Sequence, residues 1–185
     1  MDLIILDRDG VINFDSDAYI RSPGQWRPIP GSLEAIARLH QRGHRVVVAS
    51  NQSGIARGLF TLDTLHAIHR AMLDAVSRHG GAIDAVVFCP SCDDSHPQRK
   101  PNPGMLWEIA RRLAVPLAGV PFIGDSLGDV VAALRAGATP VLVRTGKGCR
   151  TEARLATAPE TQGHPVPVFD DLAAAVDQLL KDSPA

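Results

Sequence analysis

Residues 3–10 read LIILDRDG, in which four consecutive apolar residues are followed at once by two acids flanking an arginine. Apolar residues in a row, without alternation, are typical of a short strand buried on both faces of a parallel sheet. Polar residues directly after such a strand lie at the edge where open α/β sheets bind ligands. This segment therefore predicts a parallel sheet with a functional site at the end of its first strand.

The rest of the chain repeats this pattern of strand and helix. Further apolar runs lie at 46–49, 85–88, 121–123, 140–143 and 166–169, and stretches with apolar residues at helical spacing separate them. The helix signals include Ser32 as an N-cap, Gly43 as a stop, and Asn102 as an N-cap before a proline. The alternation predicts one open doubly wound, Rossmann-like α/β domain over residues 1–185. The connections are too short for a large cap domain.

Composition excludes several classes of partner. The 185 residues carry a net charge of −1, without a basic stripe, so we expect no nucleic-acid partner. The chain has neither a basic leader followed by an apolar segment nor an apolar run long enough to span a membrane. Three cysteines do not make an even disulfide framework, which favours a reducing compartment. We expect a cytoplasmic monomer.

Polar residues follow several predicted strands at the same edge of the sheet. Two acids end the first strand, a serine ends the second, and a Gly-Asp-Ser segment with a further acid ends the fourth. A lysine precedes the helix that begins near residue 102. The candidate catalytic and metal-binding residues are Asp7, Asp9, Ser50, Lys100, Asp125 and Asp129.

These residue types suit phosphoryl transfer. Asp7 and Asp125 would repel each other if they were unpaired, and a hard divalent cation such as Mg²⁺ resolves that repulsion. The cation also neutralises an incoming phosphate. Lys100 and Ser50 would hold the remaining phosphate oxygens. If Asp9 is held protonated, it can donate a proton to the leaving alkoxide and later accept one from the attacking water.

Each feature also has a plain structural explanation when it is taken alone. Two aspartates separated by one residue are common in turns, Ser-Asn after a strand is ordinary turn chemistry, and a lysine before a helix is usually solvated. Their joint occurrence, in order and each at a strand end or helix start, favours the functional interpretation.

Four motifs make the chain resemble the haloacid-dehalogenase-like (HAD-like) hydrolase superfamily. They are LDRDGV (6–11), ASNQSG (49–54), RKPNPGM (99–105) and GDSLGD (124–129), and the resemblance spans residues 3–146. The resemblance implies that Asp7 is the nucleophile, that Asp9 is the general acid and base, and that Ser50 and Lys100 stabilise the phosphoryl group. It also implies a magnesium ion held by Asp7, the Asp9 backbone carbonyl and Asp125, with Asp129 close by.

Finer segments resemble the heptose-bisphosphate phosphatase and histidinol-phosphatase branch of that superfamily. They are LDRDGVIN (6–13), SNQSGIARG (50–58) and LVRTGKG (142–148), and members of this branch lack a large cap. The resemblance implies a small phosphorylated sugar as substrate. The leading candidate is the 7-phosphate of D-glycero-D-manno-heptose 1,7-bisphosphate, on the route to the lipopolysaccharide core sugar. Histidinol phosphate or another small phosphomonoester is the alternative.

The branch commonly carries a zinc loop of the form C-x-H followed by C-x-C, and this sequence departs from it. The first cysteine is present as Cys89, but Ser91 stands at the histidine position and no C-x-C follows. Cys92 and His96 remain as possible zinc ligands, with Asp93 or Asp94 as a fourth. Structural zinc needs four well-placed ligands. We therefore expect a short loop with two reduced cysteines rather than a zinc site.

Substrate recognition falls to loops around the strand ends, because no cap is expected. The candidates are Asp15, Ser16, Asp17, Tyr19, Asn51, Gln52, Ser53, Arg99 and Ser126. Arg99 suits the second phosphate of a bisphosphorylated sugar, because a guanidinium binds phosphate in a bidentate way. The alternative is that Arg99 pairs with Asp93 or Asp94.

Two further classes of function remain open. A signalling receiver domain also clusters acids, a lysine and a hydroxyl at strand ends, but it has no acid in the place of Asp9. A catalytically silent phosphosugar-binding protein is the other possibility, and the complete set of catalytic residue types argues against it.

Overall fold

A six-stranded parallel sheet forms the centre of the computed structural model, which describes residues 3–182. The strand order is β3-β2-β1-β4-β5-β6. The strands are β1 (Leu3–Leu6), β2 (Arg45–Asn51), β3 (Ala85–Cys89), β4 (Pro121–Gly124), β5 (Thr139–Val143) and β6 (Val168–Phe169). The predicted doubly wound α/β fold is confirmed. The sixth strand is shorter than the predicted range 166–169.

Six α-helices of the described residues cover the sheet. They are α1 (Ser32–Gln41), α2 (Leu62–Arg78), α3 (Gly104–Leu113), α4 (Leu127–Ala136), α5 (Gly148–Leu155) and α6 (Leu172–Asp182). Two short 3₁₀ helices, η1 (Pro23–Gln25) and η2 (Pro159–Thr161), lie in loops. The sequence did not predict α5, because it has no apolar stripe and buries only Gly148 and Thr151. No helix in the described range is both long and apolar enough to cross a membrane.

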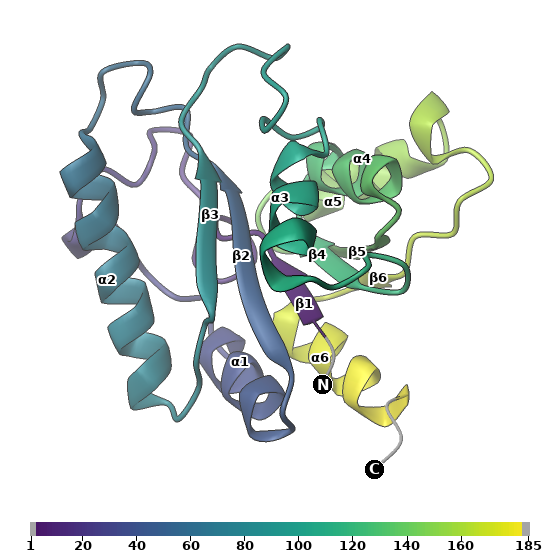
Figure 1. Ribbon diagram of the computed structural model, residues 1–185, viewed down its shortest axis with the longest axis horizontal. Helices are drawn as coiled ribbons and strands as arrows, with labels where there is room; N and C mark the ends of the chain where they lie inside the picture. Colours follow the sequence, from purple (N-terminus) through teal and green to yellow (C-terminus); the bar gives the residue numbers. More distant parts are fainter. Residues whose placement is uncertain (1–2, 183–185) are drawn as a thin grey trace.

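The helices form one layer on each face of the sheet (Figure 1). Leucine, isoleucine and valine side chains of α1, α2 and α6 pack against one face, where they meet alternate residues of β1 and β2 such as Ile4 and Val46. Residues of α3 and α4 pack against the other face, where they meet Ile5 and Val47. Both faces of the central strands are therefore buried, which explains their uninterrupted apolar sequences.

Two predicted helix caps were wrong. Ser32 is the first residue of α1 and not its cap; Gly31 occupies the cap position, and the Ser32 hydroxyl donates to the carbonyl of Ile12. Asn102 does not cap α3, which begins at Gly104. In both cases the side chain makes a tertiary hydrogen bond in place of the local cap that the sequence pattern favours.

The sheet topology places a functional edge next to β1. The chain winds from β1 through β2 to β3 on one side and then crosses to β4 on the other side. Strand order therefore reverses between β1 and β4, and open α/β sheets bind ligands at the carboxyl edge of such a switch point. Asp7 directly follows β1 and Asp125 directly follows β4.

Candidate active site

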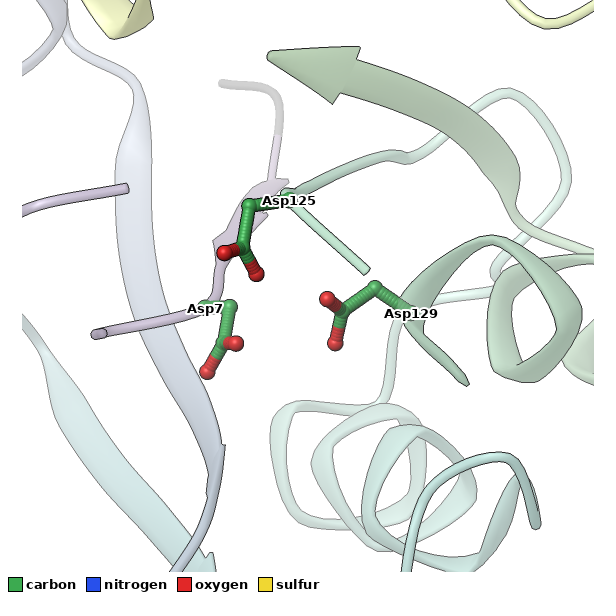
Figure 2. Close-up of side chains that lie close together, drawn as sticks. All are labelled: Asp7, Asp125 and Asp129. Carbon is green, nitrogen blue, oxygen red and sulfur yellow. The ribbon is translucent and has the colours of Figure 1, made fainter. Parts of the chain in front are cut away.

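Three buried carboxylates meet at this edge. Asp7 follows β1, Asp125 follows β4, and Asp129 lies in the first turn of α4. Figure 2 shows the three side chains gathered in one small space, and one oxygen from each lies within 4.8 Å of the others. The predicted convergence of these acids is therefore present.

The pKa values of these acids reflect burial and mutual repulsion. Burial raises the pKa of Asp7 to about 7, Lys100 opposes this rise, and the negative charges of Asp129 and Asp9 add to it. Burial, followed by the charges of Asp129 and Asp7, raises the pKa of Asp125 to about 8. The cluster is thus unfavourable in its ionised form unless additional positive charge is present.

The donor set fits magnesium. Each member of the cluster offers a carboxylate oxygen, the hard ligand that Mg²⁺ prefers, and a divalent cation offsets the repulsion that raises the two pKa values. Within residues 3–182, this is the only group of at least three acid, histidine or cysteine side chains close enough to hold a metal ion.

Lys100 supplies the cation already present in the site. Its buried ammonium donates to the carbonyl of Ala49 at 2.8 Å and contacts Asp7 Oδ1 at 3.0 Å and Asp129 Oδ1 at 2.6 Å. Burial alone would lower the pKa of Lys100, but the Asp129 and Asp7 carboxylates raise it above its ordinary value. Lys100 is therefore a fixed positive charge.

Asn51 holds the backbone of Lys100. The Asn51 amide donates to the carbonyl of Lys100 at 3.0 Å, and the backbone N–H of Lys100 donates to Asn51 Oδ1 at 3.1 Å. Sequence reasoning assigned Asn51 to substrate binding. In the structure its side chain ties the end of β2 to the loop that carries Lys100.

Ser126 and Asp129 form a capping box at the start of α4. The Ser126 hydroxyl accepts from the Asp129 backbone N–H, and Asp129 Oδ2 accepts from both the backbone N–H and the hydroxyl of Ser126. The other oxygen of Asp129 contacts Lys100. Asp129 therefore links the helix cap to the lysine, and the Ser126 side chain takes part in that cap.

The prediction that Asp9 is held protonated does not agree with its surroundings. Burial would raise the pKa of Asp9, but the positive charge of Arg8 and hydrogen bonds from Asn13, Gln52 and Arg8 outweigh it. The pKa of Asp9 is therefore below its ordinary value, and the carboxylate form is favoured before any substrate is bound.

The loop after β5 holds Asp125 in place. The backbone N–H of Lys147 donates to Asp125 Oδ2 at 2.7 Å, and the Thr145 hydroxyl donates to the carbonyl of Gly10 at 2.6 Å. Gly10 and Gly146 have positive φ angles of 82° and 59°, and a Cβ on either would overlap Asp125 Oδ2. Glycine is required at both positions because of this close approach.

A pocket of about 370 Å³ opens above the cluster. Every residue predicted to bind substrate lines it, namely Asp15, Ser16, Asp17, Tyr19, Asn51, Gln52, Ser53, Arg99 and Ser126. Ser50 also lines the pocket and accepts a hydrogen bond from Gln52 Nε2 at 2.8 Å. The backbone of Tyr19 has a φ of 65°, an uncommon conformation for a bulky residue and one that clusters at functional sites.

Arg99 has the acidic partner that the alternative interpretation anticipated. Its Nε donates to Asp94 Oδ1 at 2.9 Å, and its Nη1 donates to the carbonyl of Ser91 at 3.1 Å. Asp93 instead accepts from the backbone and hydroxyl of Ser95. Arg99 nevertheless lines the pocket, so its pairing with Asp94 fixes the guanidinium at the rim.

The three possible zinc ligands do not come together. Cys89 is buried, with its Sγ 3.6 Å from His96 Nδ1, whereas Cys92 is exposed. They do not form a group of ligand atoms within metal-binding distance in the described chain. The expectation of a metal-free loop remains a prediction, which elemental analysis of protein purified without added metal tests.

Sequence reasoning missed three cationic residues of the pocket: Arg8, Arg57 and Lys147. Lys147 follows β5, so the rule used for the other strand ends would have found it. Its Nζ contacts Asp15 Oδ2 at 3.0 Å, which joins two loops across the pocket. Arg57 lies in the loop after β2, where a cation suits an anionic ligand. Arg8 carried no such signal, because an arginine beside two aspartates looks like an ordinary surface charge.

Comparisons with known proteins agree with this geometry. The HAD-hydrolase-like family model matches residues 98–175. D-glycero-beta-D-manno-heptose-1,7-bisphosphate 7-phosphatase of Bordetella bronchiseptica is 53% identical over 184 residues, which cover 99% of this chain and 100% of that protein. The enzyme of the same name from Pseudomonas putida is 52% identical over 97% of this chain and 100% of its own length.

Solved structures of heptose 1,7-bisphosphate phosphatases also resemble this chain. The crystal structure of the heptose 1,7-bisphosphate phosphatase from B. bronchiseptica, complexed with magnesium and phosphate, has a TM-score of 0.92 and covers 99% of this chain and 100% of that one. The corresponding phosphatase from Burkholderia thailandensis is 43% identical, with a TM-score of 0.75, and covers 98% of this chain and 100% of its own. This chain belongs to the D-glycero-beta-D-manno-heptose-1,7-bisphosphate 7-phosphatase family of HAD-like hydrolases.

Proposed function

We propose that the chain acts as one domain, a magnesium-dependent phosphatase that removes the 7-phosphate of D-glycero-beta-D-manno-heptose 1,7-bisphosphate. Asp7 carries the phosphoryl group between the sugar and water. The substrate is inferred from relatives that are 50–53% identical over nearly the whole chain and bear the name of this activity. Histidinol phosphate, the alternative from the sequence, has no counterpart among these relatives' names.

The observation that carries the proposal is the arrangement of Lys100 among the acids. Its ammonium contacts Asp7 and Asp129 beside Asp125, at the end of a pocket rimmed by Arg57, Arg99 and Lys147. A nucleophilic carboxylate, a buried cation and acids that suit a metal ion are the parts that phosphoryl transfer requires.

In the first step Asp7 attacks phosphorus. The backbone N–H of Arg8 and the ammonium of Lys100 both approach Asp7 Oδ1, at 2.7 and 3.0 Å, which leaves Oδ2 to form the new P–O bond. The bond from phosphorus to the sugar oxygen breaks, and the sugar oxygen keeps the electron pair of that bond and accepts a proton from Asp9. A bound phosphate dianion raises the pKa of Asp9 by charge repulsion, which favours the proton-donating form.

In the second step water releases phosphate. Asp9, now a carboxylate, accepts a proton from the water as its oxygen attacks phosphorus. The P–O bond to Asp7 breaks, and the carboxylate of Asp7 is restored. Ser50 and Lys100 hold the non-bridging oxygens during both steps.

Asp7 and Asp125 would hold magnesium, with Asp129 close by. When bound, the ion neutralises charge on the phosphoryl group and on the carboxylates. Asp129 supports the site by pairing with Lys100, because its Oδ2 is already committed to the helix cap.

A substrate panel tests the proposal. We expect purified protein with Mg²⁺ to give a higher kcat/KM for the heptose bisphosphate than for histidinol phosphate or fructose bisphosphate, and EDTA to abolish turnover. A preference for histidinol phosphate would transfer the substrate assignment to that compound. Full activity in metal-free buffer, or no phosphatase activity at all, would refute the mechanism itself.

A further inference from the structure

Arg8 is a buried arginine between the two catalytic aspartates. Its side chain is 1% exposed. A buried guanidinium is unfavourable unless it is paired, so its partners indicate what it does. Nε and Nη2 of Arg8 are hydrogen-bonded, whereas its Nη1 has no partner among the described residues. The partner is Asp9: Arg8 Nε donates to Oδ1 at 3.0 Å, and Nη2 lies 2.9 Å from Oδ1 and 2.8 Å from Oδ2. This forked contact fixes the plane of the Asp9 carboxylate.

Two further side chains hold the same carboxylate. Asn13 Nδ2 donates to Asp9 Oδ1 at 2.8 Å, and the Asn13 amide is itself oriented by Trp26, whose Nε1 donates to Asn13 Oδ1 at 2.9 Å. Gln52 Nε2 donates to Asp9 Oδ2 at 3.0 Å, while Gln52 Oε1 accepts from Arg8 Nη2 at 3.2 Å. Donors from the loops after β1 and β2 therefore meet on Asp9.

This arrangement separates Asp9 from the other acids. Asp9 and Asp7 line the same pocket, yet the Asp9 side chain does not belong to the cluster of Asp7, Asp125 and Asp129. Arg8 pairs with the Asp9 carboxylate, whereas Lys100 contacts Asp7 and Asp129.

We infer that Arg8 is a positioning residue, which keeps the Asp9 carboxyl out of the metal cluster and aimed at the oxygen that leaves phosphorus. The inference rests on the proposed function, because it assigns Arg8 a role in the proton transfer made by Asp9. Proton transfer requires donor and acceptor within about 2.6–3.2 Å, so a small rotation of Asp9 is enough to interrupt it. In this role Arg8 acts through Asp9 and transfers no proton itself.

Leaving-group dependence tests this role. A sugar alkoxide needs a proton as it leaves, whereas p-nitrophenolate does not. Arg8→Lys keeps the charge and loses the fork. We expect kcat/KM for the heptose bisphosphate to fall about 10- to 100-fold, part of the roughly 10²–10⁴-fold contribution of a positioned general acid. The kcat/KM for p-nitrophenyl phosphate should fall less than about threefold, since that rate does not depend on the donated proton.

A second variant disturbs the Asp9 carboxylate through Asn13 rather than through Arg8. Trp26→Phe removes the N–H that orients Asn13 and keeps a smaller aromatic ring at this buried position, so we expect a smaller loss with the same substrate selectivity. It decides the question if Arg8→Lys fails to fold. Arg111→Lys is the matched control, because Arg111 makes a similar forked contact with Glu108 on the surface of α3. This control should leave both rates unchanged.

Asp9→Asn separates failure of this inference from failure of the proposed function. If Asp9→Asn lowers kcat/KM equally for the heptose bisphosphate and for p-nitrophenyl phosphate, Asp9 is not the general acid. The role of Arg8 then fails with it. Asp9→Asn could instead lower kcat/KM for the sugar substrate alone. If Arg8→Lys and Trp26→Phe then lower kcat/KM equally for both substrates, or for neither substrate, only the role of Arg8 is refuted. Selective losses in all three variants support it.

Discussion

Asp7 is the residue on which the proposed chemistry depends. Asp7→Asn removes the nucleophile, so we expect turnover to disappear while the protein still folds. Asp9→Asn should lower the rate about 10²- to 10⁴-fold, the usual contribution of a positioned general acid. Turnover assays alongside thermal melts measure both effects. Asp74→Asn, an exposed position on α2, is the control. Near-normal turnover in Asp7→Asn would contradict the covalent mechanism.

Arg99 is expected to recognise the second phosphate. Arg99→Ala should lower kcat/KM for the heptose bisphosphate about 10- to 150-fold more than for a monophosphate, because a hydrogen bond to a charged group contributes about 1.5–3 kcal/mol. Arg112→Ala, on the exposed face of α3, is the control. Equal losses on both substrates would place Arg99 at the transferred phosphate. No loss on either would leave it as the partner of Asp94 alone.

The N-terminus of α4 couples helix stability to the active site. Ser126→Ala removes half of the capping box and should cost about 1 kcal/mol, or about 2–4 °C in melting temperature. We also expect a lower kcat, because Asp129 loses a partner and so orients Lys100 less well. Thr61→Ala is the matched control, since the Thr61 hydroxyl caps α2 through Thr64. It should show the stability loss with normal kcat, and a normal kcat in both variants would refute the coupling.

The turn after β5 is a second element whose geometry controls the site. Gly146→Ala forces a Cβ toward Asp125, so we expect the magnesium affinity to fall at least about tenfold, together with a cost of about 1–2 kcal/mol for the positive φ. Gly119→Ala isolates the backbone effect, because Gly119 has a φ of 78° and no atom near the added Cβ. Metal titrations and melts of both variants distinguish the two contributions. Equal magnesium affinity in the two variants would contradict the idea that the turn after β5 holds Asp125 in place.

Stability of the whole molecule should depend on pH and magnesium together. Asp7 and Asp125 have folded-state pKa values of about 7 and about 8, above the ordinary value of 3.8. An acid whose pKa is raised by folding stabilises the protein at low pH, and this stabilisation is lost as the pH rises from about 4 to about 8. Metal binding requires the deprotonated carboxylates.

We therefore expect Mg²⁺ to raise the melting temperature more at about pH 8.5 than at about pH 5.5. Melts with and without Mg²⁺ at the two pH values measure the difference. Asp7→Asn, which removes one titrating member of the cluster, should reduce it. An equal shift at both pH values would show that the cluster does not exchange protons for the metal.

Much of this fold was predictable because the strands of a parallel sheet are buried on both faces. The run 3–6 matches β1, and the acids that follow it meet those after β4 as the topology requires. The capping roles predicted for Ser32 and Asn102 were wrong, since each side chain bonds to a segment that the local sequence does not reveal.

The roles of polar side chains were harder to predict than their location. Asn51 and Gln52 were expected to face the substrate, and both line the pocket, but their amides bond to Lys100, Asp9 and Ser50. An amide at a strand end looks the same in sequence whether it contacts ligand or protein. Only the three-dimensional arrangement distinguishes the two.

The central position of β1 has a consequence for how the chain matures on the ribosome. Asp7 is synthesised early, but one edge of its strand pairs with β4, and the brace on Asp125 comes from the later turn after β5. A nascent chain that ends before β4 leaves that edge of β1 open and Asp7 without the other acids of the cluster. Magnesium therefore cannot guide the early stages of folding. In those stages the partial sheet of β1, β2 and β3 has an open edge at β1, where wrong strand pairing can occur.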